Sequence, residues 1–341
     1  MPTLRPDIGV EIVGTGRYLP ERRITNADLV QVMDTSDEWI VQRTGIRERR
    51  KADPDAGETV AGMATAALRT ALGRAGVAPH ELDLCIVATV GAEMPCPSTA
   101  CQVLGKLHGP DAPPIRAGAF DLTAACSGFV YGLNLAHEML RSGFYRTAAV
   151  VGVERLSSWL AYATHHRDHA IIFGDGAGAT VLRATPDSGK GALAHTMHSD
   201  GSRWVDLYMP SHPRHFPEGE YDEAKLGLMR MNGRGVFKFA VGTFGDAIQE
   251  CLDRSGLTPD DVDHFVCHQS NVRILEAARD RFGLPPEKLY INIDRYGNTS
   301  AASVPICLDE LREQGRILPG QKVMFVAFGG GLTWTTSLWQ V

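Results

Sequence analysis

Short apolar runs alternate along the chain with longer segments in which apolar residues recur every three or four positions. The short runs are rich in Val, Ile, Ala and Phe and predict β-strands at 9–16, 82–90, 117–123, 147–154, 178–184, 264–269 and 322–328. The longer segments predict helices at 58–76, 128–142, 234–255, 271–283 and 300–315. This alternation predicts an α/β fold, and the nearly continuous apolar strands predict sheets covered by helices on both faces.

The predicted elements also repeat within the chain. RAGVAPHELDLCIVAT (74–89) aligns with RSGLTPDDVDHFVCHQ (254–269) at an offset of 180. FDLTAACSGFVYGLNLAHEMLRSG (120–143) aligns with NIDRYGNTSAASVPICLDELREQG (292–315) at an offset near 172. Self-similarity of this kind indicates a duplicated architecture.

We therefore predict two related α/β halves, residues 1–184 and residues 185–341. Residues 185–230 are rich in Pro, His, Gly and charge, and we expect them to be an insertion in the second half.

Composition and charge exclude several classes of protein. The 341 residues are 44% hydrophobic and 22% charged, which argues against disorder, and the net charge of −6 argues against a nucleic-acid partner. No apolar run reaches the ~18 residues of a membrane span, and the N-terminus lacks a signal-peptide pattern. Seven cysteines without a CxxC pair predict reduced thiols and a cytoplasmic location.

Cys126, in LTAACSGF, is the first candidate for catalysis. It follows a predicted strand and opens a predicted helix, so the helix dipole should lower the thiol pKa, and its small neighbours leave room for an acyl group. A buried structural cysteine is the alternative. The remaining cysteines in predicted strands and helices are expected to be core residues: Cys85, Cys251, Cys267 and Cys307.

Two further candidates belong to the second half. His268 ends a predicted strand, where α/β folds place their sites, and Ala88 occupies the matched position of the first half. Asn298 aligns with Cys126 in the second pair of segments. A pseudo-twofold axis would bring both helix N-termini to one cleft. The alternatives are a core histidine for His268 and a helix N-cap for Asn298.

Several glycine-rich or histidine-rich segments need separate interpretation. FGGGLTW (328–334) could aim backbone N–H groups at an oxyanion, or form a tight turn. GDGAGAT (174–180) and GTG (14–16) lack the context of phosphate and dinucleotide loops and are expected to be structural. HHRDH (165–169) has no metal-ligand spacing and is expected to be a polar loop, so we predict no metal site.

Six motifs occur along the chain in the same order as in one known protein family. They are SDEWIVQRTGIRER (36–49), TAACSGFVYGL (123–133), IIFGDGAGA (171–179), HQSN (268–271), GNTSAAS (297–303) and FGGGLTW (328–334). Over nearly the whole chain they resemble the β-ketoacyl-[acyl-carrier-protein] synthase III enzymes, which are initiating members of the thiolase-fold condensing enzymes. The resemblance implies a duplicated thiolase-like five-layer αβαβα fold with two pseudo-symmetric halves, and a homodimer.

The resemblance also implies an acyltransferase that runs a ping-pong Claisen condensation. The Cys126 thiolate would attack an acyl-CoA, with the N–H groups of Cys126 and Gly330 holding the oxyanion. Malonyl-acyl-carrier-protein would then lose carbon dioxide, and His268 and Asn298 would donate to its thioester carbonyl. Acyl-CoA is a substrate here, and no metal or redox cofactor is implied.

Four residues are implied to bind coenzyme A. Trp39 and Arg167 match a pair that sandwiches adenine, Arg43 a residue near the phosphates, and Asn271 a residue that contacts pantetheine.

Three further positions concern the carrier protein and the acyl group. Lys238 and Arg273 match a basic patch for the carrier protein, although Asp280 stands where some members carry Lys. Cys96 stands where familiar members carry Phe at the end of the acyl tunnel, contributed across the dimer. We therefore expect tolerance of branched or longer primers.

Other functions stay open on the sequence alone. The runner-up is a specialised relative that primes a polyketide or transfers acyl groups in secondary metabolism. A non-catalytic α/β binding protein and a cysteine hydrolase are the remaining alternatives.

Overall fold

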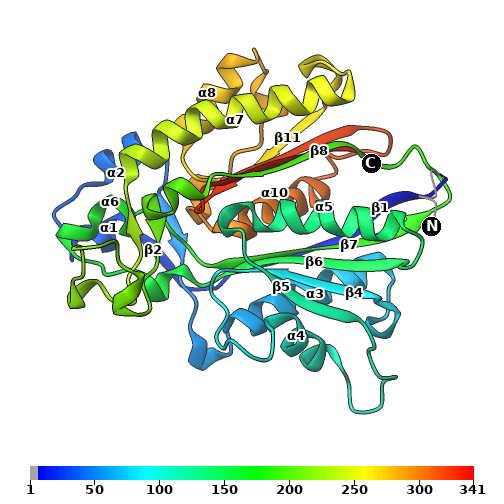
Figure 1. Cartoon of the computed structure of the whole chain (residues 1–341), viewed down its shortest axis with the longest axis horizontal. Helices are drawn as coiled ribbons and strands as arrows, with labels where there is room; N and C mark the ends of the chain where they lie inside the picture. Colours follow the sequence, from blue (N-terminus) through cyan, green and yellow to red (C-terminus); the bar gives the residue numbers. More distant parts are fainter. Residues whose placement is uncertain (1–6) are drawn as a thin grey trace.

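The computed structural model describes residues 7–341, which form five stacked layers in the order helices, sheet, helices, sheet, helices (Figure 1). The strands are β1 (Gly9–Tyr18), β2 (Arg23–Thr25), β3 (Glu48–Arg50), β4 (Leu84–Ala88), β5 (Gly118–Leu122), β6 (Thr147–Glu154), β7 (Gly176–Thr185), β8 (Gly191–Ser199), β9 (Leu207–Tyr208), β10 (Arg230–Met231), β11 (His264–Cys267), β12 (Lys322–Gly329) and β13 (Thr333–Gln340). The α-helices are α1 (Asn26–Val30), α2 (Asp37–Thr44), α3 (Val60–Ala75), α4 (Thr99–Leu107), α5 (Gly128–Arg141), α6 (Arg167–Ala170), α7 (Gly233–Ser255), α8 (Val272–Arg281), α9 (Ile293–Tyr296) and α10 (Ser303–Glu313). The predicted α/β class is confirmed.

The first sheet has the strand order β1-β7-β6-β4-β5. β4 is parallel to β5 and β6, while β7 runs antiparallel to β6 and β1. Every residue of β4 and β6 is buried, as their unbroken apolar runs predict. α3 and α4 cover one face of this sheet, and α5 and α10 fill the space between it and the second sheet.

The second sheet repeats the arrangement with the order β11-β12-β13-β8. β11 is parallel to β12, and β13 and β8 are antiparallel to their neighbours. A single parallel bridge between Phe265 and Leu289 stands where β5 pairs with β4 in the first sheet. α7 and α8 cover the outer face. The internal repeat in the sequence therefore reflects two similar sheets with their helices.

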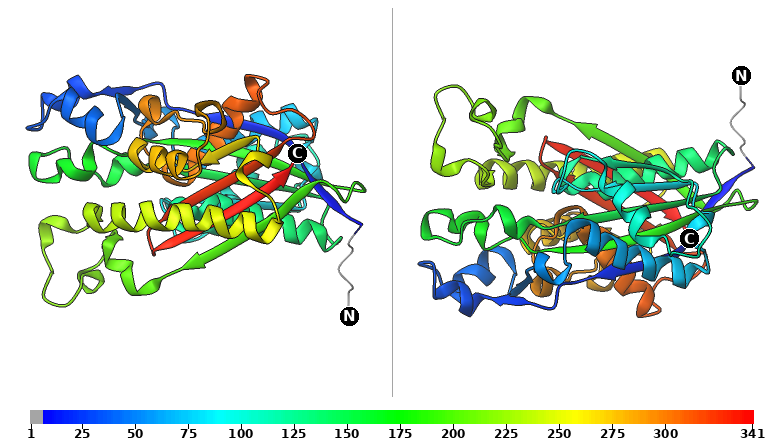
Figure 2. Two further views of the ribbon diagram at one scale, coloured as in Figure 1. Left: turned by 90° about the horizontal axis from the view of Figure 1, so that it is seen from above. Right: turned by 90° about the horizontal axis from the view of Figure 1, so that it is seen from below.

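Two strands of the second sheet, β8 and β13, are absent from the sequence-based expectation. Both carry hydroxyl side chains at buried positions, Thr196 on β8 and Thr335, Thr336 and Ser337 on β13; Thr196 and Thr336 are joined at 2.7 Å between their hydroxyls. The predicted insertion at 185–230 is therefore partly wrong, because β8 belongs to the sheet. The remainder, 200–230, forms short turns and the small β9–β10 pair at the end of the molecule away from the C-terminus (Figure 2).

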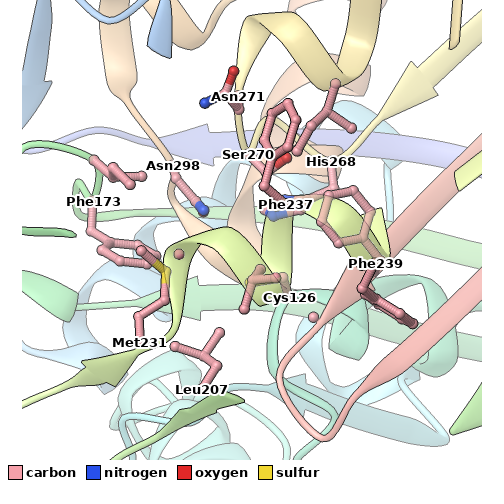
Figure 3. Close-up of a pocket in the computed structure, with 16 residues that line it drawn as sticks. Cys126, Phe173, Leu207, Met231, Phe237, Phe239, His268, Ser270, Asn271 and Asn298 are labelled. Atoms are coloured by element: carbon pink, nitrogen blue, oxygen red, sulfur yellow. The ribbon is translucent and has the colours of Figure 1, made fainter. Parts of the chain in front are cut away.

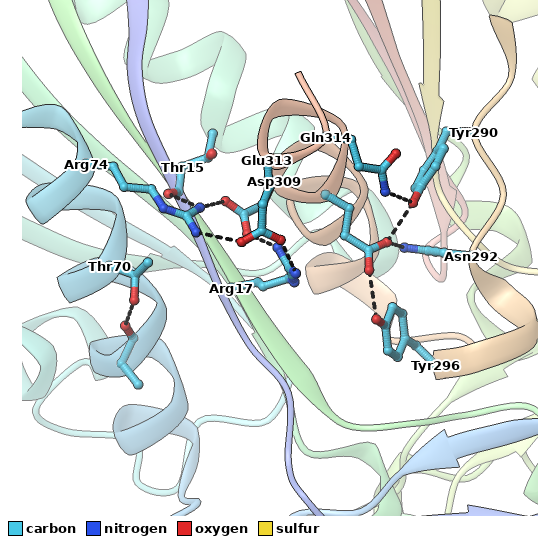
Figure 4. Close-up of polar contacts among 12 residues, drawn as sticks. Thr15, Arg17, Thr70, Arg74, Tyr290, Asn292, Tyr296, Asp309, Glu313 and Gln314 are labelled. Carbon is cyan, nitrogen blue, oxygen red and sulfur yellow. Dashed lines mark hydrogen bonds and ion pairs between the residues drawn. The ribbon is translucent and has the colours of Figure 1, made fainter. Parts of the chain in front are cut away.

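The central helix α10 is held by two adjacent carboxylates. Asp309 is buried and pairs with Arg74 of α3 at 2.6 Å and with Arg17 of β1 (Figure 4). Glu310 is buried and accepts from Tyr296 at 2.7 Å, and also from Tyr290, Asn292 and Arg295. These contacts fix the helix that follows the Asn298 segment. No helix within residues 7–341 is both long and apolar enough to cross a membrane.

Each half also supports a turn of the other half through a glycine. A Cβ on Gly152 of β6 would lie 2.2 Å from the carbonyl oxygen of Ala301, in the short 3-10 turn η11 (Ser300–Ala302). A Cβ on Gly329 of β12 would lie 2.6 Å from the amide nitrogen of Cys126, in the equivalent turn η3 (Ala125–Ser127). Only glycine permits this backbone approach, so the two turns meet at the centre of the molecule.

Candidate active site

Cys126 lies at the junction of the two halves. It occupies η3, between β5 and α5, and its side chain is buried. The preceding residue, Ala125, has a positive φ of 47°, an unfavourable conformation for a residue with a side chain. This sharp turn presents the Cys126 thiol to a cavity (Figure 3).

Burial dominates the ionisation of this thiol. It raises the pKa of Cys126 to about 12, and a hydrogen bond from Ser300 only partly offsets the effect. The expectation of a lowered pKa is therefore wrong for the free protein, because desolvation outweighs the helix end. The thiol must lose its proton to another group when it reacts.

His268 directly follows β11, and its backbone N–H donates to the carbonyl of Val326 on β12. Its Nδ1 lies 2.7 Å from the hydroxyl of Ser303, which also donates to the carbonyl of Ser300. Burial lowers the pKa of His268 to about 3, so the imidazole is neutral at physiological pH. Because Ser303 occupies Nδ1, Nε2 is the ring nitrogen left for a substrate or for the thiol.

Asn298 is held by its own backbone. Its N–H donates to Ile172, and its carbonyl accepts from Gly174. Its Oδ1 accepts the N–H of Ser300 at 2.8 Å, so the amide nitrogen is the group that faces the cavity in Figure 3. Asn298 does not cap a long helix, which was the alternative interpretation of this residue.

The alignment of Asn298 with Cys126 is wrong by three residues. The turns η3 and η11 start at Ala125 and Ser300, which share a positive φ of 47–48°, so Cys126 corresponds to Ala301. The offset near 172 holds at the ends of α5 and α10 but not at their beginnings, because α10 is three residues shorter.

One cavity of about 80 Å³ brings the three candidates together: Cys126 from the first half, and His268 and Asn298 from the second (Figure 3). Its other walls are mostly apolar and include Phe237 and Phe328. A thiol, a neutral imidazole and a carboxamide thus share a small space with mostly apolar walls. Such a site can form a covalent thioester and donate hydrogen bonds to a developing oxyanion.

A second cavity, of about 270 Å³, opens on the other side of Cys126. It reaches Gly330 and is lined by apolar side chains from the 3-10 turn η4 (Leu156–Trp159), from β9 and from the irregular segment that follows: Leu156, Leu207, Tyr208, Met209 and Met229. Sequence analysis missed these residues, because the segment has no periodic pattern. Cys96 does not line this cavity; it is exposed on the chain described here.

A third cavity, of about 650 Å³, forms the entrance and contains all six residues predicted to bind coenzyme A or the carrier protein. These are Trp39, Arg43, Arg167, Lys238, Asn271 and Arg273. Arg234 also lines it, and its signal in the sequence is its place one helical turn before Lys238. Five cations and one carboxylate, Asp168, make this mouth suitable for anions.

Trp39 and Arg167, the two residues predicted to bind adenine, are in contact with each other. The guanidinium carbons of Arg43 and Arg167 lie 4.5 and 5.1 Å from the ring centre of Trp39. A purine between Trp39 and Arg167 would need about 7 Å, two van der Waals contacts, so Arg167 must move outward. Asn271 caps α8 and donates to the carbonyl of Arg43 at 2.9 Å, which ties α2 to α8.

Potential metal ligands lie away from this site. The one group of three within residues 7–341 is His137, Glu138 and His195, whose ligand atoms lie within 4.8 Å. Nε2 of His137 accepts the N–H of Ala192, so Nδ1 carries the proton and donates to Glu138. A metal on that nitrogen would displace the proton. The HHRDH segment, expected to be a polar loop, forms short helical turns in which His166 and His169 are buried and His165 is exposed.

Comparison with known proteins decides the family. The description "3-Oxoacyl-[acyl-carrier-protein (ACP)] synthase III" matches residues 120–201, and its C-terminal counterpart matches residues 252–341. The β-ketoacyl-[acyl-carrier-protein] synthase III of Caldanaerobacter subterraneus subsp. tengcongensis is 46% identical over 332 residues, 97% of each chain. The chain belongs to the 3-oxoacyl-[acyl-carrier-protein] synthase III family.

Two solved structures place the chain within this family. The synthase III of Aquifex aeolicus superposes with a TM-score of 0.88 at 40% identity, covering 98% of this chain and 100% of that one. The priming β-ketosynthase of the R1128 polyketide biosynthetic pathway gives 0.87 at 35% identity, covering 98% and 96%. The predicted family, its thiolase-type fold and the class of condensing acyltransferases are confirmed.

Proposed function

We propose that this enzyme condenses an acyl-CoA primer with malonyl-acyl-carrier-protein and so initiates fatty-acid synthesis. The observation that carries the proposal is the shared cavity of Cys126, His268 and Asn298. It lies between an apolar acyl-sized cavity and a cationic entrance. A nucleophile in that position can take an acyl group from one side and present it to a second substrate.

In the first half-reaction, Cys126 attacks the acyl-CoA carbonyl. The thiol proton passes to Nε2 of His268 and then to the departing CoA sulfur, so the histidine ends neutral. The N–H groups of Cys126 and Gly330 stabilise the oxyanion of the tetrahedral intermediate. The acyl chain then occupies the cavity beside Leu207 and Met229.

In the second half-reaction, the malonyl thioester carbonyl lies near His268 and Asn298. Loss of carbon dioxide leaves an enolate, whose oxygen receives hydrogen bonds from Nε2 of His268 and from the Asn298 amide. This step needs the other neutral tautomer: Nε2 takes up a proton from solvent, Nδ1 gives one up, and the Ser303 hydroxyl turns from the Ser300 carbonyl to donate to Nδ1. The carbanion attacks the acyl-Cys126 carbonyl, and the thiolate leaves.

The entrance recognises two anionic substrates in turn. We propose that Trp39, Arg43 and Arg167 hold the nucleotide end of coenzyme A, and that Asn271 lies beside pantetheine. Lys238 and Arg273 form the patch for the acidic carrier protein. In this proposal the reaction needs no metal or redox cofactor, because its steps are acyl transfer, decarboxylation and carbon–carbon bond formation, none of which is an oxidation or a reduction by an outside reagent.

We propose a homodimer through β5. It is an edge strand, and its Phe120 and Leu122, which pack against the core, are only partly buried in one chain. A partner there would lie near the loop of Cys96 and could bring that residue toward the acyl cavity. The boundary near residue 185 and a cytoplasmic location remain predictions.

Intact-mass measurement after incubation with acetyl-, isobutyryl- and hexanoyl-CoA tests the acylation step. We expect an acyl adduct on the wild-type chain and none on Cys126→Ala, whereas the exposed-thiol control Cys101→Ala should acylate normally. Because the acyl cavity exceeds an acetyl group, branched and longer primers should react within tenfold of acetyl-CoA. An acetyl preference above tenfold over both would reject that primer range.

A second function, polyketide priming, is favoured by the likeness to the R1128 enzyme. Offering the acyl-enzyme malonyl groups on fatty-acid and polyketide carrier proteins, and measuring released carbon dioxide, separates the two. Faster release with the polyketide carrier would favour the alternative. No release with either carrier would refute condensation.

A further inference from the structure

A carboxyl group behind the nucleophile has no role in the steps above. Glu154 is the last residue of β6 and is 0% exposed. Its Oε1 accepts from the Ser300 hydroxyl at 3.1 Å, and its Oε2 from the Thr89 hydroxyl at 3.3 Å and the Val90 N–H at 3.2 Å. These donors are neutral, and within residues 7–341 no basic side chain is among the main influences on the carboxyl.

Ser300 links this carboxyl to the sulfur. Its hydroxyl donates to Glu154 at 3.1 Å, a hydrogen bond with Ser300 lowers the pKa of the Cys126 thiol, and both Ser300 and Cys126 line the acyl cavity. Ser300 has a positive φ of 48°, a conformation that costs energy for a residue with a side chain. The bond from its N–H to Asn298 Oδ1 helps to hold it there. The strained turn thus holds Ser300 against the carboxyl and at the cavity that contains the nucleophile.

The protonation of Glu154 decides what that hydroxyl can do. Burial raises the pKa of Glu154 to about 8, so the carboxyl is mostly protonated at neutral pH. A protonated carboxyl can donate to the Ser300 oxygen, which frees the single hydroxyl proton of Ser300 for the sulfur. An ionised carboxylate takes that proton for itself, and its charge opposes a thiolate.

We propose that protonated Glu154 and Ser300 form a donor pair that stabilises the Cys126 thiolate, and that loss of the Glu154 proton abolishes this support. Both are positioning residues, since neither contacts the reacting carbon. The proposal rests on the proposed function for its role in acyl transfer. The thiolate itself can be measured without any acyl substrate.

Other charged groups near this end of β6 are already paired. Arg155 follows Glu154 and lies 4.0 Å from Glu93. Asp175 precedes β7, is buried, and accepts from the Ser157 hydroxyl and from backbone N–H groups. The turns η3 and η11 contribute no charged side chain apart from a Cys126 thiolate. His268, the other titratable group at the cavity, bonds to Ser303 and is neutral across pH 6–10, so Cys126 is the group that should respond to Glu154.

The test is the pH dependence of Cys126 alkylation by iodoacetamide between pH 6 and 10. Peptide mass spectrometry separates Cys126 from the exposed Cys96 and Cys101. The wild-type rate should flatten above pH 8, whereas the Glu154→Gln rate should keep rising. The variant-to-wild-type ratio should grow about tenfold from pH 7 to pH 9.5, the effect of one pKa unit on the thiol.

Ser300→Ala should lower the alkylation rate at pH 7 by about tenfold and remove the flattening. Asp175→Asn, a change at a buried carboxyl without contact to the thiol, is the matched control and should keep the wild-type profile. A constant ratio across pH for Glu154→Gln would overturn the proposal, as would wild-type reactivity of Ser300→Ala at pH 7. If the variants do not fold, a wild-type profile without an inflection near pH 8 overturns it. Failure of acyl-CoA to label Cys126 would instead count against the proposed function.

Discussion

The free energy of unfolding of Glu154→Gln, measured relative to that of the wild type, should increase as the pH rises. The ordinary pKa of a glutamate is 4.5, and burial raises that of Glu154 to about 8. The folded chain therefore binds this proton more tightly than the unfolded chain. Its contribution to stability is fully present below pH 4.5, falls between pH 4.5 and 8, and is lost above pH 8.

The size of the effect follows from the two pKa values. A difference of about 3.5 units corresponds to about 5 kcal/mol over the whole pH range, of which about 3 kcal/mol falls between pH 5 and pH 8. Glutamine cannot ionise, so the free energy of unfolding of Glu154→Gln lacks this slope. The measured quantity is how the difference in unfolding free energy between variant and wild type varies with pH. An effect of the amide that is the same at every pH therefore cancels.

Urea unfolding at pH 5, 6, 7 and 8, at one protein concentration, measures this difference. The variant should gain about 1 kcal/mol per pH unit over the wild type. Glu313→Gln is the flat control, because Arg17 lowers the pKa of Glu313 below its ordinary 4.5, so its contribution to stability is lost only at lower pH and stays constant between pH 5 and pH 8. A Glu154→Gln difference that stays constant between pH 5 and pH 8 would refute a buried, protonated carboxyl.

Three further predictions follow from the packing and the site. Gly152→Ala should lower the free energy of unfolding by about 1–3 kcal/mol in a urea titration, because the added Cβ meets a backbone carbonyl. Gly105→Ala, which has open space around the added Cβ, should be neutral or stabilising in the same titration. The pH dependence of wild-type acylation should show no inflection near 6.5 from His268, since its imidazole stays neutral down to about pH 3; an inflection there that disappears in His268→Gln would contradict this. Arg167→Ala should raise KM for acyl-CoA by about tenfold with kcat little changed, and an equal loss in kcat would assign Arg167 to the chemistry instead.

Much of the architecture could be predicted from local pattern. The apolar runs of β4 and β6 and the matched turns at Gly76 and Gly256 indicate two similar halves, since burial on both faces of a sheet requires such strands. β8 and β13 were missed because their polar side chains bond to one another inside the molecule. That pairing joins residues distant in the chain and leaves no periodic signal.

The sequence by itself determined the motifs and family that pointed to Cys126, His268 and Asn298. Only the tertiary structure decided how these residues meet: Asn298 reaches the cavity from beside η11, and Cys126 corresponds to Ala301. It also decided the ionisation of the thiol and the walls of the acyl cavity. The physical reason is that a motif records residue types along one stretch of chain. Desolvation, close backbone approach and cavity shape depend on what the other half of the molecule places against that stretch.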